Sequence, residues 1–335
     1  MGIAVVEMQP RRHEEREGHS WKDARQALRV CVVAVIVLGS GSHAWAGDRY
    51  ALLITGASGG EQYAQKYDMW RSAFVNLFRE KFDYPDDHLI VLSEDGAGAR
   101  AATRENVRAA LGDLRRRVQK EDVLTVIVIG HGTALDADTA KFNLVGPDLS
   151  ADEWADLVKP IAGRLVFVDA SAGSFPFLRR LAAPGRVILT ATDSPGQQFE
   201  TVLPEFLIKA FEDPSADADK NGKISMWEAF VFASAGVKKW YDDRGRLATE
   251  RPMLEDGGAA VGALARVTYL QPDAAIPAST DAELARLLKR RIELESQVDL
   301  LRVQKPTLTN QQYEAELEKL LTELARIDRQ IRSKS

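Results

Sequence analysis

A chain of 335 residues is long enough to bury one sizeable core together with an accessory element. Its net charge of −5 argues against a general nucleic-acid-binding surface, so we expect no nucleic-acid partner. The only cysteine, Cys31, lies in an apolar stretch near the amino terminus. The chain beyond it therefore offers no thiol nucleophile, no disulfide and no cysteine metal ligand.

The amino-terminal segment has the order of a secretory signal. Basic residues precede the apolar stretch Val30–Leu38, and small residues ending in Ala44-Trp45-Ala46 follow it. The stretch is much shorter than the ~20 residues that span a bilayer, so we expect no stable membrane span after cleavage. We assign residues 1–46 to a signal peptide with its leader, cleaved near Gly47, and predict a secreted or periplasmic protein. A short anchor or a buried strand is the alternative.

Apolar runs of strand length then alternate with segments whose apolar residues follow helical spacing. The strands that we expect are Tyr50–Thr55, His88–Leu92, Val123–Ile129, Leu165–Val168 and Arg186–Thr190. The helices that we expect are Glu61–Phe82, Thr103–Val118, one opened by Ser150 after a loop, Phe177–Leu181, Glu205–Phe211 and Met226–Trp240. This alternation predicts an α/β fold whose mainly parallel sheet is covered on both faces, with its site at the carboxyl ends of the strands.

The sequence changes character after Gln271–Thr280, a segment rich in Pro and Ala that we interpret as a linker. Two capping-box patterns, Thr280 with Glu283 and Thr309 with Gln312, mark helix starts on either side of Pro306. Apolar residues recur in both helices at steps of three and four: Leu284, Leu287, Leu294, Val298 and Leu301, then Tyr313, Leu317, Leu320, Leu324, Ile327 and Ile331. We predict a coiled-coil-like helical hairpin over 281–335, which closes on itself, on the core domain or on another copy.

The twelve-residue segment 217–228 matches the EF-hand calcium loop at each defining position. Oxygen ligands at alternating positions converge on one ion, and Gly222 permits the sharp turn that brings them round. The ligands that we predict are the side chains of Asp217, Asp219, Asn221, Ser225 and Glu228 and the backbone carbonyl of Lys223. The sequence shows no second loop to pair with this one, so we predict structural calcium rather than a sensor. An acidic turn that only binds water is the alternative.

Two of the expected strands end in turns of small residues that carry polar side chains. Gly130-His131-Gly132 follows one strand, and Asp169-Ala170-Ser171-Ala172-Gly173 follows the next. Because parallel strands end at one edge of a sheet, we expect His131 and Ser171 to lie side by side as a candidate site. A histidine that only fills an exposed turn is the alternative for His131.

With these turns, the segment from about Arg49 to Asp256 resembles the caspase-fold cysteine peptidases, nearer to legumain-like bacterial members than to animal caspases. The resemblance implies a caspase-like three-layer αβα sandwich, which we place at 47–270 and which includes the calcium loop. In that family a histidine and a cysteine form the catalytic dyad, and these positions fall on His131 and Ser171. A serine hydroxyl is a weaker nucleophile than a thiolate and needs a hydrogen-bonded base.

The serine leads to three interpretations of function. The first is a catalytically degenerate, secreted peptidase homologue that binds a peptide or protein segment and is stabilised by calcium. The second is an active endopeptidase or other hydrolase that uses His131 and Ser171. The third is a calcium-dependent structural or adaptor protein that acts, and self-associates, through the hairpin at 281–335.

Overall fold

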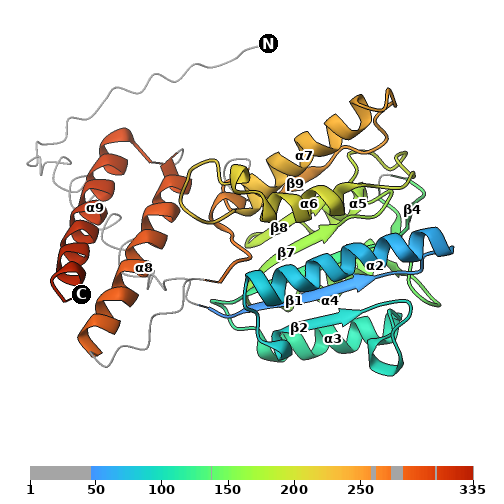
Figure 1. Ribbon diagram of the computed structural model, residues 1–335, viewed down its shortest axis with the longest axis horizontal. Helices are drawn as coiled ribbons and strands as arrows, with labels where there is room; N and C mark the ends of the chain where they lie inside the picture. The colour runs from blue at the N-terminus through green and yellow to red at the C-terminus, as the bar shows by residue number, and fades with distance from the viewer. Residues whose placement is uncertain (1–46, 137, 258–261, 273–281, 306–307, 335) are drawn as a thin grey trace, which may run out of the picture. The chain divides into compact units, whose positions relative to one another are not determined.

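The computed structural model describes residues 47–136, 138–257, 262–272, 282–305 and 308–334 (Figure 1). The predicted signal peptide and most of the predicted linker, with the helix start expected at Thr280, lie outside the described residues. A six-stranded sheet runs in the order β2-β1-β3-β7-β8-β9. Its strands are β1 (Arg49–Thr55), β2 (Leu89–Leu92), β3 (Val123–Ile129), β7 (Arg164–Asp169), β8 (Arg186–Thr190) and β9 (Met253–Glu255).

The sheet is parallel except at one edge. The strands from β2 to β8 pair in parallel, whereas β9 pairs with β8 in antiparallel orientation. Every residue of β1, β3 and β7 is buried, because helices cover both faces and favour continuous apolar runs in the central strands. The mainly parallel α/β sheet predicted from the sequence is confirmed, and β9 is an addition that its short length hid.

Helices lie on both faces and complete the caspase-like αβα sandwich. One apolar cluster joins Leu53 of β1 to α2, α6 and α7, and the opposite cluster joins Leu52 to α3, α4 and α5, because successive side chains of a strand point to opposite faces. The helices are α2 (Glu61–Asn76), α3 (Arg104–Arg117), α4 (Ala151–Val158), α5 (Phe175–Leu181), α6 (Leu203–Glu212) and α7 (Met226–Asp242). Shorter helical turns are η1 (Leu77–Lys81), η2 (Asp86–His88), η3 (Gly98–Arg100), η4 (Pro214–Ala216) and η5 (Ala265–Val267).

The segment between β3 and α4, which we expected to be a loop, forms a second small sheet. Its strands are β4 (Gly132–Ala134), β5 (Ala140–Phe142) and β6 (Leu149–Ser150), all paired in antiparallel orientation. Strands of two and three residues are too short to give a periodic signal, so the expectation of a plain loop was wrong. This sheet places β4 directly after His131, next to the turn that carries Ser171.

The carboxyl-terminal helices α8 (Ala282–Gln304) and α9 (Asn310–Arg332) form the predicted hairpin. Their shared apolar seam buries Leu287, Leu294 and Ile327, and α9 begins with the predicted capping box at Thr309. Ion pairs flank the seam, with Arg290 at 2.9 Å from Glu323. The hairpin therefore has a core of its own. Among the described residues, no helix combines the length and apolar character needed to cross a membrane.

Candidate functional site

The turns that carry His131 and Ser171 open at the same edge of the sheet. Thr55 lies opposite Ile129 and Val128 lies opposite Asp169 in the parallel register, so β1, β3 and β7 end side by side. The turn after β1 contributes the backbone of Ser58 to this edge, where its carbonyl contacts the imidazole of His131. Three strand ends thus supply the groups from which the site is built.

Ser171 is fully buried, and both of its hydrogen-bond donors serve one carboxylate. Its hydroxyl donates to Oδ1 of Asp169 at 2.6 Å, and its backbone N–H donates to the same oxygen at 3.0 Å. The hydroxyl also lies 3.4 Å from the carbonyl oxygen of Ala172. In this arrangement Ser171 has neither a free hydroxyl hydrogen nor a free amide hydrogen to offer to a ligand.

Asp169 is the site residue that the sequence argument did not single out. Its side chain has no exposed surface, and within the described chain its Oδ2 has no hydrogen-bond partner. Burial raises the pKa of this carboxyl to about 6, while the two hydrogen bonds from Ser171 act in the opposite direction. A proton on Oδ2 removes an unpaired buried charge, so the neutral acid is favoured below that pH. In the sequence, the one feature that could have pointed to Asp169 is that it is the last residue of an apolar strand.

His131 is half-buried and is held by groups other than Ser171. Its Nε2 lies 2.8 Å from the carbonyl oxygen of Ser58 and 3.3 Å from the hydroxyl of Tyr67. Because a carbonyl oxygen only accepts, Nε2 must carry the hydrogen, which assigns the tautomer. The ring of Tyr63 meets the imidazole edge-on at 4.8 Å between centroids. Within the described structure no hydrogen bond joins His131 to Ser171.

The turn at Ser171 is covered by β4 and by the segment that leads into α6. A Cβ added at Gly132 would lie 2.4 Å from the carbonyl oxygen of Ala172 and 2.6 Å from the hydroxyl of Ser171, so only glycine fits there. Gly173, at φ 62°, donates its N–H to the carbonyl of Gln197 at 2.8 Å. These close backbone contacts exclude solvent from Ser171.

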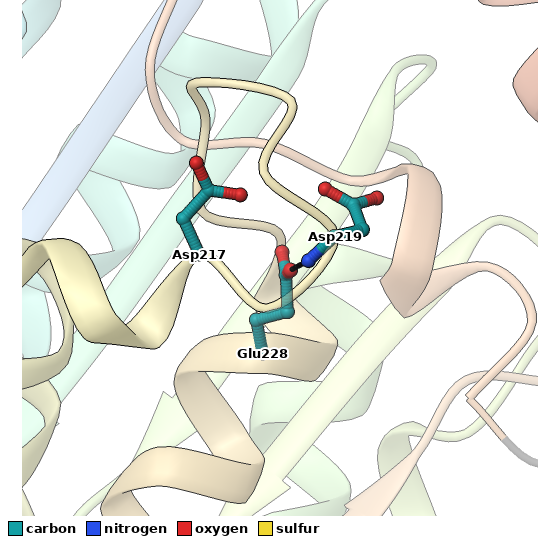
Figure 2. A group of neighbouring side chains, drawn as sticks. All are labelled: Asp217, Asp219 and Glu228. Atoms are coloured by element: carbon teal, nitrogen blue, oxygen red, sulfur yellow. Dashed lines mark hydrogen bonds between the residues drawn. The ribbon is translucent and has the colours of Figure 1, made fainter.

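The second candidate site is the loop at 217–228, which lies between α6 and α7. Carboxylate oxygens of Asp217, Asp219 and Glu228 lie within 4.8 Å of one another (Figure 2). Partial desolvation within the loop and the nearby charge of Glu228 raise the pKa of the exposed Asp219, as expected where like charges converge without a cation. Oxygen ligands of this kind and spacing suit Ca²⁺.

Backbone hydrogen bonds already preorganise this loop. Glu228 accepts from the N–H of Ala218 at 2.9 Å and of Asp219 at 3.2 Å with one oxygen (Figure 2). Its other oxygen accepts from the N–H of Ser225, whose hydroxyl caps α7. The loop turns at Gly222, where φ is 84°, a left-handed conformation that glycine adopts without strain.

Two of the other predicted ligands, Asn221 and Ser225, place their side chains in hydrogen bonds with the carboxylates. Asn221 bonds to Asp219 through its amide nitrogen at 3.1 Å and accepts from the N–H of Lys223 through its amide oxygen at 2.8 Å. The hydroxyl of Ser225 donates to Glu228 at 2.7 Å. The side chains of Asn221 and Ser225 thus lie among the carboxylates but are bonded to them.

The loop at 217–228 has a pairing partner that the sequence did not reveal. Ser225 forms an isolated antiparallel bridge with Tyr269, and the N–H of Met226 donates to the carbonyl of Thr268 at 2.8 Å. The amide of Asn221 also reaches the hydroxyl of Tyr269 at 3.2 Å. The segment after η5 therefore supports the loop where a second calcium loop was absent from the sequence.

Comparison with curated proteins finds a distant relative of this chain. No protein-family model matches the chain. Over 201 residues, 53% of the chain, it is 29% identical to metacaspase-4 from Arabidopsis thaliana, and the match covers 44% of that protein. The chain thus spans less than half the length of this curated relative. The solved structure of protein GSU0716 from Geobacter sulfurreducens aligns with 65% of this chain and 96% of its own at 17% identity, with a TM-score of 0.41.

The distant metacaspase similarity and the mostly parallel sheet with flanking helices together support a caspase-like peptidase homologue. The likeness to GSU0716 is too low to carry an argument about function.

Proposed function

We propose that this chain is a caspase-like peptidase homologue that has lost efficient hydrolysis and binds a peptide or protein segment at the former catalytic edge. One observation carries the proposal: the hydroxyl and the amide of Ser171 both donate to the buried Asp169. Acyl transfer needs a nucleophile that can pass its proton to a base, and it needs free N–H groups to stabilise the oxyanion. Both groups are already occupied at Ser171.

The imidazole of His131 supports the same proposal. Because Nε2 of His131 donates to the carbonyl of Ser58 at 2.8 Å, Nδ1 is the nitrogen that could act as a general base. Within the described residues, no hydrogen bond joins the imidazole to Ser171, and no carboxylate bonds to it in the manner of the third group of a serine triad. The pair therefore lacks the hydrogen bond between nucleophile and base that serine catalysis requires.

Exposed apolar side chains beside this edge support peptide binding. Leu135 is 79% exposed and Phe199 is 63% exposed. Their segments are joined by the side-chain amide of Gln198, which donates to the carbonyl of Ala134 at 2.5 Å. Large apolar side chains gathered at a polar edge are typical of protein interaction sites. The half-buried His131 and its tyrosine neighbours offer polar and aromatic contacts at the same edge.

We also propose that calcium binds at 217–228 and stabilises the region around α7. Two observations support this proposal: the three carboxylates converge, and partial desolvation together with the charge of Glu228 raises the pKa of Asp219. A secreted or periplasmic location, proposed from the signal-like order of residues 1–46, suits a structural site, because extracellular modules use sites with Kd of ~10⁻⁴–10⁻³ M.

The proposed loss of hydrolysis is tested by incubating the chain with a diverse peptide library, with calcium and with a chelator, and by labelling with a fluorophosphonate. We expect no cleavage above background and no adduct at Ser171. Cleavage that disappears in His131→Ala and persists in the matched variant His88→Ala would overturn the proposal, since His88 stacks on Tyr50 elsewhere in the fold.

The binding function is tested with the same library, and the readout is retention of peptides rather than their cleavage. Immobilised chain is expected to retain a subset of peptides, and His131→Ala and Phe199→Ser are each expected to release them. Unchanged retention by both variants would place binding elsewhere and contradict the proposed location.

A further inference from the structure

α9 carries a second face that points away from its seam with α8. We name it the outer stripe; its apolar residues are Leu317, Leu321 and Ala325, and its polar residues are Glu314, Glu318, Thr322, Arg326 and Arg329. Leu321 is 46% exposed. The seam uses other residues, with Ile327 buried and Leu320, Leu324 and Ile331 packed around it, so Leu317 lies outside the seam in which its heptad spacing had placed it. The hairpin core therefore does not account for the outer stripe.

Charge is segregated along this stripe. Glu314 and Glu318 lie toward the start of α9, and Arg326 and Arg329 lie toward its end. None of the four takes part in an ion pair within the described chain. Charges beside the seam are paired instead, as in Arg290 with Glu323 at 2.9 Å and Arg291 with Asp328 at 3.4 Å. The stripe thus carries four charges of α9 that have no ion-pair partner within the described chain.

The helix alone does not explain this arrangement. The helix dipole favours acidic residues in the first turn and basic residues in the last, and its effect falls off beyond those turns. Glu318 and Arg326 lie further inside α9 (Asn310–Arg332) than that reach. In addition, Glu314 and Glu318 are spaced i,i+4, where like charges destabilise an isolated helix. A partner with the reverse charge order would place basic residues opposite Glu314 and Glu318, and their attraction would offset this repulsion.

We propose that the outer stripe docks against the outer stripe of a second copy of this chain, with the two α9 helices antiparallel. In that orientation Glu314 and Glu318 of one copy face Arg329 and Arg326 of the other, and Leu321 lies near the two-fold axis. The interface uses the same patch on both copies, which gives a closed dimer. A parallel arrangement would oppose like charges along the whole stripe. The inference stands independently of the proposed peptide binding.

Charge reversal gives a sharp test in the full chain, with sedimentation velocity as the readout. Glu314→Arg with Glu318→Arg makes the stripe basic, and Arg326→Glu with Arg329→Glu makes it acidic. Each double variant should self-associate roughly tenfold more weakly or worse. An equimolar mixture of the two should form a heterodimer, and the variant with all four changes should recover self-association, because its charge order is only inverted.

The control matches the change in net charge. Glu105→Arg with Glu212→Arg adds the same charge at exposed positions of α3 and α6 and should leave association unchanged. Circular dichroism checks helix content, and recovery in the mixture shows that each variant remains folded. A wild-type chain that stays monomeric through the micromolar range would overturn the proposal. So would self-association that survives both reversals, or a mixture that fails to associate.

Discussion

The sheet edge at Ser171 and the loop at 217–228 both bring carboxylates and hydrogen-bond donors together. They differ in how deeply the carboxylates are buried and in whether the groups are free to bind a ligand. At the sheet edge, a fully buried Asp169 takes both donors of Ser171. In the loop, three carboxylates converge nearer the surface. Asp217 and Glu228 are partly buried, and Asp219 is exposed. The difference shows that the availability of a polar group, more than its identity, decides what a site can do.

Gly132→Ala should break the closed edge and have the largest effect. The new Cβ would lie 2.4 Å from a backbone oxygen and 2.6 Å from the hydroxyl of Ser171, so β4 or the Ser171 turn must shift. We expect a loss of about 3 kcal/mol in the free energy of unfolding, measured by urea denaturation.

The matched control is Gly112→Ala in the middle of α3, where a Cβ meets nothing within 4 Å. That change should stabilise the chain by about 0.5–1 kcal/mol, because alanine favours the helix more than glycine does. Equal effects of the two changes would mean that the turn is not packed against β4 as described.

Asp219→Asn should separate the open loop from the closed edge by weakening the response to calcium. The wild-type chain should gain about 2.7 kcal/mol when calcium is one hundred times its Kd, and the variant should gain less at the same calcium concentration, because a neutral amide replaces a carboxylate ligand. In chelator the variant should equal or slightly exceed the wild type, because the repulsion that Glu228 exerts on Asp219 is gone.

Thermal unfolding with and without calcium measures both effects, and Glu212→Gln, outside the loop, should keep the full calcium response. A wild-type chain that shows no calcium-dependent gain would contradict the site.

Asp169→Asn should make the free energy of unfolding depend less on pH, with a smaller effect of about 2 kcal/mol. The folded pKa of Asp169 is raised from 3.8 to about 6, so its contribution to stability is fully present below pH 3.8 and is lost as pH rises through 6. Asparagine keeps the acceptor for Ser171 without titrating. The wild type should therefore weaken relative to the variant between about pH 4 and pH 7 in urea denaturation.

Glu250→Gln provides a second window for the same measurement. Burial raises the pKa of Glu250 from 4.5 to about 8, against the opposing hydrogen bonds from the N–H groups of Val202 and Leu203. The difference from the wild type should therefore develop at higher pH than for Asp169→Asn. Coincident windows would show that the pKa of Asp169 is not set by its own burial.

The strands and helices of the sandwich were predictable because each has a strong local pattern. β3 is apolar except for Thr125, and Ser150 and Glu153 form the capping box that opens α4. β4, β5, β6 and β9 were missed because strands of two or three residues have no period to detect. The loop at 217–228 could be proposed from the sequence because all its predicted ligands lie within twelve consecutive residues.

The sequence by itself determined the alternating α/β order, the hairpin and the spacing of the carboxylates in the loop, since these depend on residues close along the chain. Only the tertiary structure decided that Ser171 bonds to Asp169, that His131 turns toward Ser58 and that Tyr269 supports the loop. Those contacts depend on which strand ends meet and on how deeply each group is buried. Burial and the competition for hydrogen-bond partners arise from the packed chain as a whole, so no local pattern records them.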